Sequence, residues 1–466
     1  MHKLSALDSG FLLTESHHSP KHVGGLQILR LPRGKGSAWL RSLLDELKQV
    51  SPGYPFDHRL RDENPVQPVL VPDEGLDLDY HVRHTVLPGP GNDEQLADMV
   101  SRLHANLLDR ERPLWEFHLI EGLADRRFAF YTKIHHAIVD GMTFARWFTE
   151  SGSFRASDRK SPPIWQRDEP PRDRPRKDGL APLISEGIKL LGGGVRTVAD
   201  LSVLSARLVQ RAVLERDRNA VLPLGAGQTR FNVPTGAARS FGMGRYPLKE
   251  FQAIAHAAGA SINDLVMALC DRAVNRYLEE HGDPPGEPLV VYMPVNLRGD
   301  DCDEGNLISL LQVKLASDHG DPLRALEQVR EASLSTREIY GSVSRPAIQM
   351  YSLLVALLPL GEELLRLDQV LPPAINLVIS NIPGPSRPMY FRGAEVTEVY
   401  PVNTLPPAVA LSMTVCSYAG TMYFGLIGGR TAIPDLSRLR DFLDRAYADF
   451  REATGIGDDT QDGPPA

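Results

Sequence analysis

One stretch of the chain changes from strand spacing to helix spacing within a few residues, and two adjacent histidines lie at the change. From Arg127 to Ile134 the side chains alternate with a period of two, which is typical of a β-strand. His135 and His136 follow, and a run of helical character starts at Met142. We therefore expect a strand, a short turn and a helix, which is a unit of an α/β fold.

The two histidines indicate acid–base chemistry. Successive strand residues face opposite sides, so only one of His135 and His136 can reach a given cavity, and the other must be hydrogen-bonded inside the fold. An imidazole with an ordinary pKa near ~6.5 is largely neutral at pH 7 and can accept a proton from a hydroxyl group. A metal hydrolase that uses these histidines is excluded on two grounds: adjacent strand residues point apart, and no third ligand is suitably spaced.

Asp140 and Gly141 complete the pattern His-His-x-x-x-Asp-Gly. Two interpretations of Asp140 stay open, since it is either the N-cap of the following helix or a member of a functional site. A single histidine is likewise more often a structural residue than a catalyst. The pattern alone does not decide between these interpretations.

Length, charge and cysteine content narrow the class of protein. The 466 residues suffice for two lobes that each bury a core. We expect a cytoplasmic protein, because no run of about 18 apolar residues and no signal-peptide core appears. Cys270, Cys302 and Cys416 are odd in number and widely spaced, which fits a reducing compartment. A formal net charge of -8 disfavours nucleic acid as a partner.

Composition divides the chain into four segments. Residues 157–178 are rich in proline and charge, and this predicts a mobile linker. Residues 180–219 have helical spacing and form either a helix packed across both lobes or an amphipathic surface on a membrane or lipid droplet. The segments are 1–154 (first lobe), 155–230 (linker and crossover helix), 231–455 (second lobe) and 456–466 (disordered tail).

Polar residues also lie at the ends of elements predicted in the second lobe. Asn263 and Asp264 fall in the first turn of a helix, where Ser261 and Asp264 fit a capping box. Arg298 follows an apolar strand and is a surface residue, a phosphate contact or a tie to a loop. Each residue has an ordinary structural interpretation beside a functional one.

Three further features leave alternatives open. Gly24-Gly25 at the head of a strand indicates either a bulge or the close approach of another backbone or a ligand. A leucine-rich helix at about 347–365 lines an acyl-chain pocket or belongs to the core. Ser380-Asn381 precedes Ile-Pro-Gly-Pro, a rigid turn that either serves the fold alone or holds the two polar side chains toward a cleft.

Four motifs in one order resemble a known family. Pro113-Leu114-Trp115 precedes the histidine pair by about 20 residues, and the Asn-Asp pair and the Ser-Asn-Ile-Pro-Gly-Pro element follow. This order is similar to that of the bacterial wax ester synthase/diacylglycerol acyltransferase family, of the chloramphenicol acetyltransferase-like superfamily. The resemblance covers most of the chain. It implies an α/β fold with two chloramphenicol acetyltransferase-like lobes, mixed sheets and an active-site tunnel at their interface.

The resemblance also implies an activity. It predicts an acyl-CoA-dependent O-acyltransferase that makes triacylglycerol from diacylglycerol or wax esters from long-chain alcohols, with acyl-CoA as a substrate and without a cofactor. His136 would be the general base, and His135, Asp140 and Gly141 would support it. The remaining expected site residues are Asn263, Asp264, Ser380 and Asn381 at the tunnel or oxyanion and Arg298 at the CoA phosphates. A peripheral place at the inner membrane or on lipid inclusions is compatible with these substrates.

Two alternatives remain beside this prediction. One is a condensation-type acyltransferase that uses a carrier-protein thioester, against which the Pro-Leu-Trp and Ser-Asn-Ile-Pro-Gly-Pro elements argue. The other is a non-catalytic protein that coats lipid droplets, against which the intact His136 and Asp140 argue.

Overall fold

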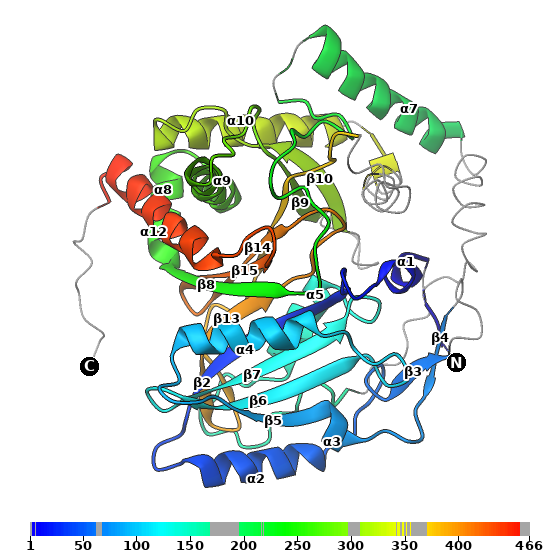
Figure 1. Ribbon diagram of the computed structural model, residues 1–466, viewed down its shortest axis with the longest axis vertical. Coiled ribbons are helices and arrows are strands. Elements are labelled where there is room, and N and C mark those ends of the chain that lie inside the picture. Colours follow the sequence, from blue (N-terminus) through cyan, green and yellow to red (C-terminus); the bar gives the residue numbers. More distant parts are fainter. Residues whose placement is uncertain are drawn as a thin grey trace.

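Two mixed β-sheets with their helices form the two lobes of the protein, and Figure 1 shows one lobe above the other. The computed structural model describes residues 2–456 except 5, 62–67, 168–194, 216, 218, 297–307, 342, 345–346, 349–350, 352–354 and 356–370. A small three-stranded sheet, in the order β1-β4-β3, accompanies the first lobe. The expected α/β fold with two mixed-sheet lobes is confirmed.

The elements before residue 231 are β1 (His2–Lys3), α1 (Ala6–Thr14), β2 (His22–Arg30), α2 (Ser37–Lys48), β3 (His58–Arg61), β4 (Val69–Pro72), α3 (Leu78–His81), β5 (Val82–Val86), α4 (Asp93–Ala105), β6 (Trp115–Leu123), β7 (Arg127–His135), α5 (Gly141–Glu150), α7 (Val195–Val209) and the π-helical turn η1 (Gln210–Leu214). The later elements are β8 (Arg239–Pro247), α8 (Leu248–Ala257), α9 (Ile262–Glu280), β9 (Val290–Asn296), β10 (Ile308–Lys314), α10 (Pro322–Gly341), β11 (Leu377–Pro383), β12 (Met389–Phe391), β13 (Ala394–Val402), β14 (Leu411–Tyr418), β15 (Thr421–Gly429) and α12 (Leu436–Ala453).

The first sheet has the strand order β12-β13-β2-β7-β6-β5. Only β5 and β6 are parallel, and the other neighbouring strands are antiparallel. The period-two run of β7 is buried on both faces, because helices pack against each of them. The ring of Trp39 from α2 lies against Phe128 on one face, and His104 of α4 hydrogen-bonds to the Tyr131 hydroxyl on the other. β2 and β7 pair without a break from His22 opposite His135 to Arg30 opposite Arg127. The last residue of a central strand is therefore His135.

The second sheet has the order β10-β9-β11-β14-β15-β8, with parallel pairing of β9, β11 and β14. In Figure 1 the helices α8, α9, α10 and α12 gather on the side of this sheet that lies away from the first lobe. The helix α9 is buried along most of its length, and its apolar side chains form the centre of the second core. The opposite side of the second lobe is left for contact with the first.

The chain crosses back between the lobes late in the sequence. The strands β12 and β13 belong to residues expected in the second lobe, yet β13 pairs with β2 and extends the first sheet. Gly425 of β15 lies against the backbone of β13, where an added Cβ would come within 1.8 Å of the Pro401 carbonyl oxygen. Two features thus join the lobes. One is the pairing of β13 with the first sheet, and the other is the close contact of Gly425 with Pro401, which any side chain at position 425 would prevent.

The proline-rich segment differs from its prediction over the part that the structure describes. Trp165 is fully buried in the core of the first lobe, its ring stacks on that of Trp115, and its indole N–H donates to the Val50 carbonyl at 3.1 Å. The prediction of a mobile linker is therefore wrong for residues 157–167. Burial of this one tryptophan offsets the entropy cost of ordering the polar, proline-rich residues around it. Residues 168–178 lie outside the described residues.

Of the expected helical segment 180–219, the structure describes α7 and η1, and residues 180–194, 216 and 218 lie outside the described residues. Leu204 and Leu208 are buried in a small cluster with side chains of the second lobe, and α7 contacts α10. Across the described chain, we find no individual helix with the length and apolar character to cross a bilayer, whereas α8 and α9 together, bent by 97°, reach that length and composition. Most of the leucine-rich segment at 347–365 and the tail from 457 lie outside the described residues.

Candidate active site

His136 lies in the turn between β7 and α5, one residue beyond the end of the strand. Its backbone N–H donates to the Lys21 carbonyl at 2.8 Å, so the turn is held against the residue that precedes β2. The Ile138 N–H donates to the His135 carbonyl at 2.9 Å and closes the turn. His135 is the last residue of β7 and His136 the first of the turn, so the strand alternation on which the prediction relied does not extend to His136.

The imidazole of His136 is covered on one face by Phe11 from α1. The rings stack with 4.1 Å between their centroids and 20° between their planes. Burial lowers the pKa of His136 to about 4, and this effect outweighs the opposing charge of Asp140. The charges of His135 and Lys21 lower the pKa in the same direction as burial. At pH 7 the ring is neutral and able to accept a proton.

His135 is wholly buried, and both ring nitrogens have neighbours. Nδ1 accepts the Ala137 N–H at 3.0 Å, which leaves the ring proton on Nε2. Nε2 lies 3.3 Å from the Glu15 carboxylate. The Nε2–Glu15 contact is an ion-pair distance and not a well-aligned hydrogen bond. His135 thus braces the turn from inside the fold, and its complete burial keeps it from a substrate.

Glu15, directly after α1, is a site residue that was not predicted from the sequence. Its carboxylate accepts the Lys21 N–H at 3.0 Å and lies 3.1 Å from the Arg110 guanidinium as well as beside His135. Burial acts to raise the pKa of Glu15, but His135, the Lys21 N–H and Arg110 outweigh it and hold the pKa below its ordinary value. One carboxylate therefore joins α1, the start of β2 and the histidine turn.

Asp140 and Gly141 start the helix α5. The Asp140 carboxylate accepts the Thr143 N–H at 2.7 Å, which is the N-cap interpretation left open above. Gly141 faces β11, and a Cβ added there would lie 3.6 Å from the Ile382 side chain. The histidine motif of the first lobe therefore meets the Ser-Asn-Ile-Pro-Gly-Pro strand of the second across the seam.

The glycine pair in β2 allows α5 to approach the first sheet. A Cβ at Gly25 would lie 2.6 Å from the ring of Phe144, and one at Gly24 would lie 3.0 Å from the Thr132 carbonyl oxygen. The pairing of β2 with β7 has no irregularity here, so the bulge interpretation is wrong. The close approach is made by a side chain of the protein itself.

The Pro-Leu-Trp element supports the strand that ends in the motif. The Leu114 carbonyl accepts the His135 N–H at 3.0 Å. The Trp115 indole N–H donates to the Phe56 carbonyl at 2.8 Å, and its ring stacks on His81. These contacts fix β6 beside β7 and make the element part of the floor under the histidine turn.

The polar residues of β11 point to two sides of the strand. Alternate residues face the same side, so Ser380 shares the side of Ile382, which turns toward α5. Asn381 turns to α9, where its side-chain Nδ2 donates to the side-chain oxygen Oδ1 of Asn263 at 2.6 Å. The structure thus brings Asn263 and Asn381 together and sets Ser380 on the side of the histidine motif.

Asp264 closes a capping box at the start of α9. One carboxylate oxygen accepts the backbone N–H of Ser261 at 3.0 Å and its hydroxyl at 2.6 Å. The other oxygen, Oδ1, is buried and has no hydrogen-bond partner among the described residues. Asp264 does not share the contact between Asn263 and Asn381. Arg298 lies outside the described residues.

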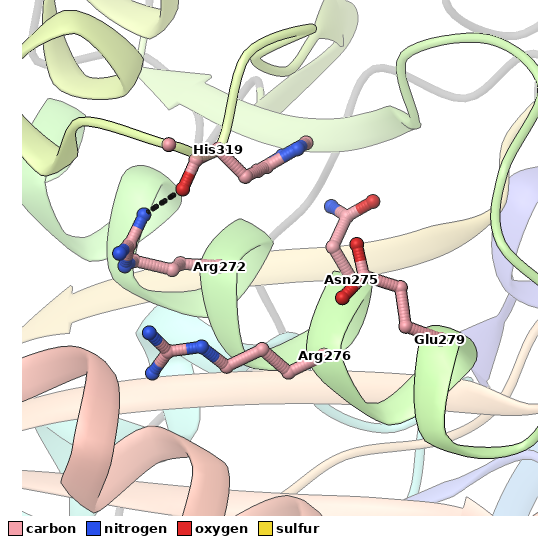
Figure 2. Close-up of a pocket in the computed structure, with 6 residues that line it drawn as sticks. Arg272, Asn275, Arg276, Glu279 and His319 are labelled. Carbon is pink, nitrogen blue, oxygen red and sulfur yellow. Dashed lines mark hydrogen bonds between the residues drawn. The ribbon is translucent and has the colours of Figure 1, made fainter.

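A cavity of about 370 Å³ on α9 is separate from this site (Figure 2). Arg272 and Arg276 line it, and both pair with Asp449 of α12, at 2.6 and 2.5 Å. Arg272 also donates to the His319 carbonyl, as Figure 2 shows. The arginines of this cavity join α9 to α12, and none of the motif residues contributes to its lining.

The two mixed-sheet lobes and the strand–turn–helix histidine motif at their seam define the class, a two-lobed acyltransferase fold of the condensation-domain type. The first condensation domain of the CDA synthetase has this fold, with a TM-score of 0.57, 18% identity and coverage of 97% of both chains. At this identity the likeness concerns the fold alone.

The chain belongs to the wax ester synthase/diacylglycerol acyltransferase family. The family's catalytic domain matches residues 4–266, and its C-terminal domain matches residues 304–451. The wax ester synthase/diacylglycerol acyltransferase of Marinobacter aquaeolei VT8 superposes with a TM-score of 0.77 at 33% identity, covering 98% of this chain and 100% of that one.

Curated relatives extend over nearly the whole chain. A probable diacylglycerol O-acyltransferase of Mycobacterium tuberculosis is 35% identical over 460 residues, which are 96% of this chain and 98% of the relative. The O-acyltransferase WSD of Acinetobacter baylyi is 32% identical over 452 residues, 95% of this chain and 96% of that one. The family resemblance inferred from the four motifs is confirmed.

Replacing Phe11 by alanine tests what holds His136 neutral. Without the phenyl ring, water reaches the imidazole and stabilises its charged form, so we expect the pKa of His136 to rise from about 4 toward the ordinary value near ~6.5. Titration of the histidine rings by NMR, with a His136→Gln variant for assignment, measures this change. Leu13→Ala, which alters an exposed side chain of the same helix, is the control. An unchanged titration in Phe11→Ala would contradict the role of Phe11.

Proposed function

We propose that the protein transfers a fatty acyl group from acyl-CoA to the hydroxyl of a diacylglycerol or a long-chain alcohol, which gives triacylglycerol or a wax ester. The observation that carries the proposal is the placement of His136, whose imidazole stacks on Phe11 beside the seam between the lobes, in a chain that belongs to this family. Burial, which lowers the pKa of His136 to about 4, supports it. Relatives with names for these activities match nearly the whole chain. A tunnel along the seam would bring the two substrates to His136 from opposite mouths.

In the proposed reaction, His136 accepts the proton of the hydroxyl while the hydroxyl oxygen bonds to the thioester carbonyl carbon. The carbon–sulfur bond then breaks, and the imidazolium returns the proton to the CoA thiolate. General-base assistance of this kind contributes ~10²–10⁴-fold to the rate. Holding the two substrates together and stabilising the oxyanion supply the remainder.

The supporting residues have distinct roles in this proposal. His135 and Glu15 position the turn, and Asp140 fixes the start of α5, because each is engaged by the protein itself. The Ser380 hydroxyl lies on the side of β11 that turns toward α5, so we assign it to the tunnel wall or the oxyanion. Asn263 and Asn381 tie α9 to β11 behind that wall.

Replacing His136 by alanine tests the proposed reaction. We expect the rate of CoA release from palmitoyl-CoA, with either diacylglycerol or hexadecanol as acceptor, to fall by about 10²–10⁴-fold. His256→Ala, which removes an exposed histidine of α8, should keep the wild-type rate. No acceptor-dependent release by the folded wild type would contradict the proposal and favour a droplet-coating protein. Equal rates for wild type and His136→Ala would remove His136 from the mechanism.

We also propose that the end of α7 and η1 rests on the lipid surface that holds the apolar acceptor. Val209 and Leu214 are 50% and 77% exposed, whereas Leu204 and Leu208 are buried against the second lobe. Apolar side chains that project from a helix already packed on its other side are suited to the interfacial layer of a membrane or droplet.

Glutamate at Val209 and Leu214 tests this contact. We expect the double variant to float less with vesicles of phosphatidylcholine, phosphatidylglycerol and diacylglycerol, because two carboxylates would have to enter the interface. The matched control is Val86→Glu, at a comparably exposed valine of β5 in the first lobe. Equal flotation of the double variant and the wild type would contradict a contact through this segment.

A further inference from the structure

A cavity of about 380 Å³ lies in the seam beside the histidine motif. One wall comes from α5 and Phe154, and the other from the end of β11 and the turn that follows it. The lining residues are Met142, Ala145, Arg146, Thr149, Phe154, Pro383, Gly384, Pro385, Ser386 and Arg387. Met142 and Pro383, which line the cavity, directly follow Gly141 and Ile382, the two residues in contact across the seam. Arg146 lies about 7.5 Å of helix rise beyond Gly141.

Both walls of this cavity are held by backbone contacts. Ser153 and Tyr390 exchange two hydrogen bonds, of 2.9 and 2.7 Å, which join the end of α5 to β12. Gly152 leaves room for Met389, whose terminal methyl would lie 2.1 Å from an added Cβ. Gly384 lies against β14, where an added Cβ would come within 2.3 Å of the Ser417 carbonyl oxygen. The backbone on both sides of the cavity is therefore fixed by hydrogen bonds and close packing.

The lining of the cavity is cationic. It holds two guanidinium groups, from Arg146 and Arg387, and its residues, all of which the structure describes, include no carboxylate. Glu150 lies outside the lining, 3.2 Å from Arg146, and also pairs with Arg167, so one carboxylate is shared by two cations. The charged groups of the lining itself are therefore both cations.

An aromatic ring stands beside these cations. Phe154 is 42% exposed, and the guanidinium carbon of Arg387 lies 4.7 Å from the centre of its ring. Guanidinium groups bind phosphates through paired hydrogen bonds, and exposed aromatic faces stack on nucleobases. The volume lies within the ~300–1,000 Å³ that is usual for small-molecule sites. An anionic ligand with an aromatic ring fits this lining.

We propose that this cavity binds the phosphorylated nucleotide end of acyl-CoA, which makes this side of the seam the entrance for the acyl donor. The assignment rests on the proposed acyl transfer for the identity of the ligand. The pantetheine arm runs from the cavity past the contact of Gly141 with Ile382 and carries the thioester to His136. Arg146 and Arg387 then determine the preference for CoA thioesters over thioesters without a nucleotide.

Binding of free CoA to the full-length protein tests the cavity without turnover. We expect calorimetry to give at least about tenfold weaker CoA binding by the double variant Arg146→Ala/Arg387→Ala than by the wild type, because two charged contacts are lost. Arg41→Ala, at an exposed arginine of α2, should bind as the wild type does. Unchanged affinity in the double variant, or no CoA binding by the wild type, would overturn the assignment.

The kinetic counterpart separates this inference from the proposed function. We expect the double variant to lose about tenfold in kcat/KM with palmitoyl-CoA and to keep the wild-type value with S-palmitoyl-pantetheine. An equal loss with both donors would overturn the nucleotide assignment. If the wild type turns over neither donor while the double variant still loses CoA affinity, the proposed function fails and the binding site stands. Dephospho-CoA in the binding assay tells whether the 3′-phosphate or the pyrophosphate is the group that is bound.

Discussion

The buried carboxylate of Glu15 is the contact on which the geometry of the site depends. Burying a charge is costly unless it is paired, and here His135, Arg110 and the Lys21 N–H surround it. The same Lys21 accepts the N–H of His136 through its carbonyl. The position of the His136 imidazole therefore depends on a residue that follows α1, the helix whose Phe11 also covers the ring.

The seam between the lobes supplies the second constraint. Both sheets contact α4, since Ser101 accepts the Phe241 N–H of β8 at 2.8 Å and His104 contacts the carbonyl of Asn403, after β13, at 3.0 Å. Figure 1 shows α4 between the two sheets. With β13 in the first sheet and Gly425 packed on it, the lobes are joined at several points. The chain can thus hold a histidine motif from one lobe opposite a strand of the other.

The sequence predicted the features that local pattern determines. The strand of Arg127–Ile134 and the capping box of Asp264 follow from spacing over a few residues. The cap at Asp140 is one of the two interpretations that the pattern left open. The pairing of β13 with β2 and the role of Glu15 join segments far apart along the chain, and no local pattern carries them. The packing of residues 157–167 was not predicted, because composition describes the segment as a whole, whereas the burial of one residue, Trp165, holds it on the first lobe.

The central claim is that a neutral His136 is the base that accepts the proton of the acceptor alcohol. The most direct measurement is the pH profile of kcat/KM for acyl transfer to diacylglycerol, with intrinsic fluorescence at each pH to verify that the protein stays folded. A base with a pKa of about 4 predicts a constant rate near neutrality and an acid limb close to that value. An acid limb at or above ~6.5, the ordinary pKa of histidine, would contradict the account.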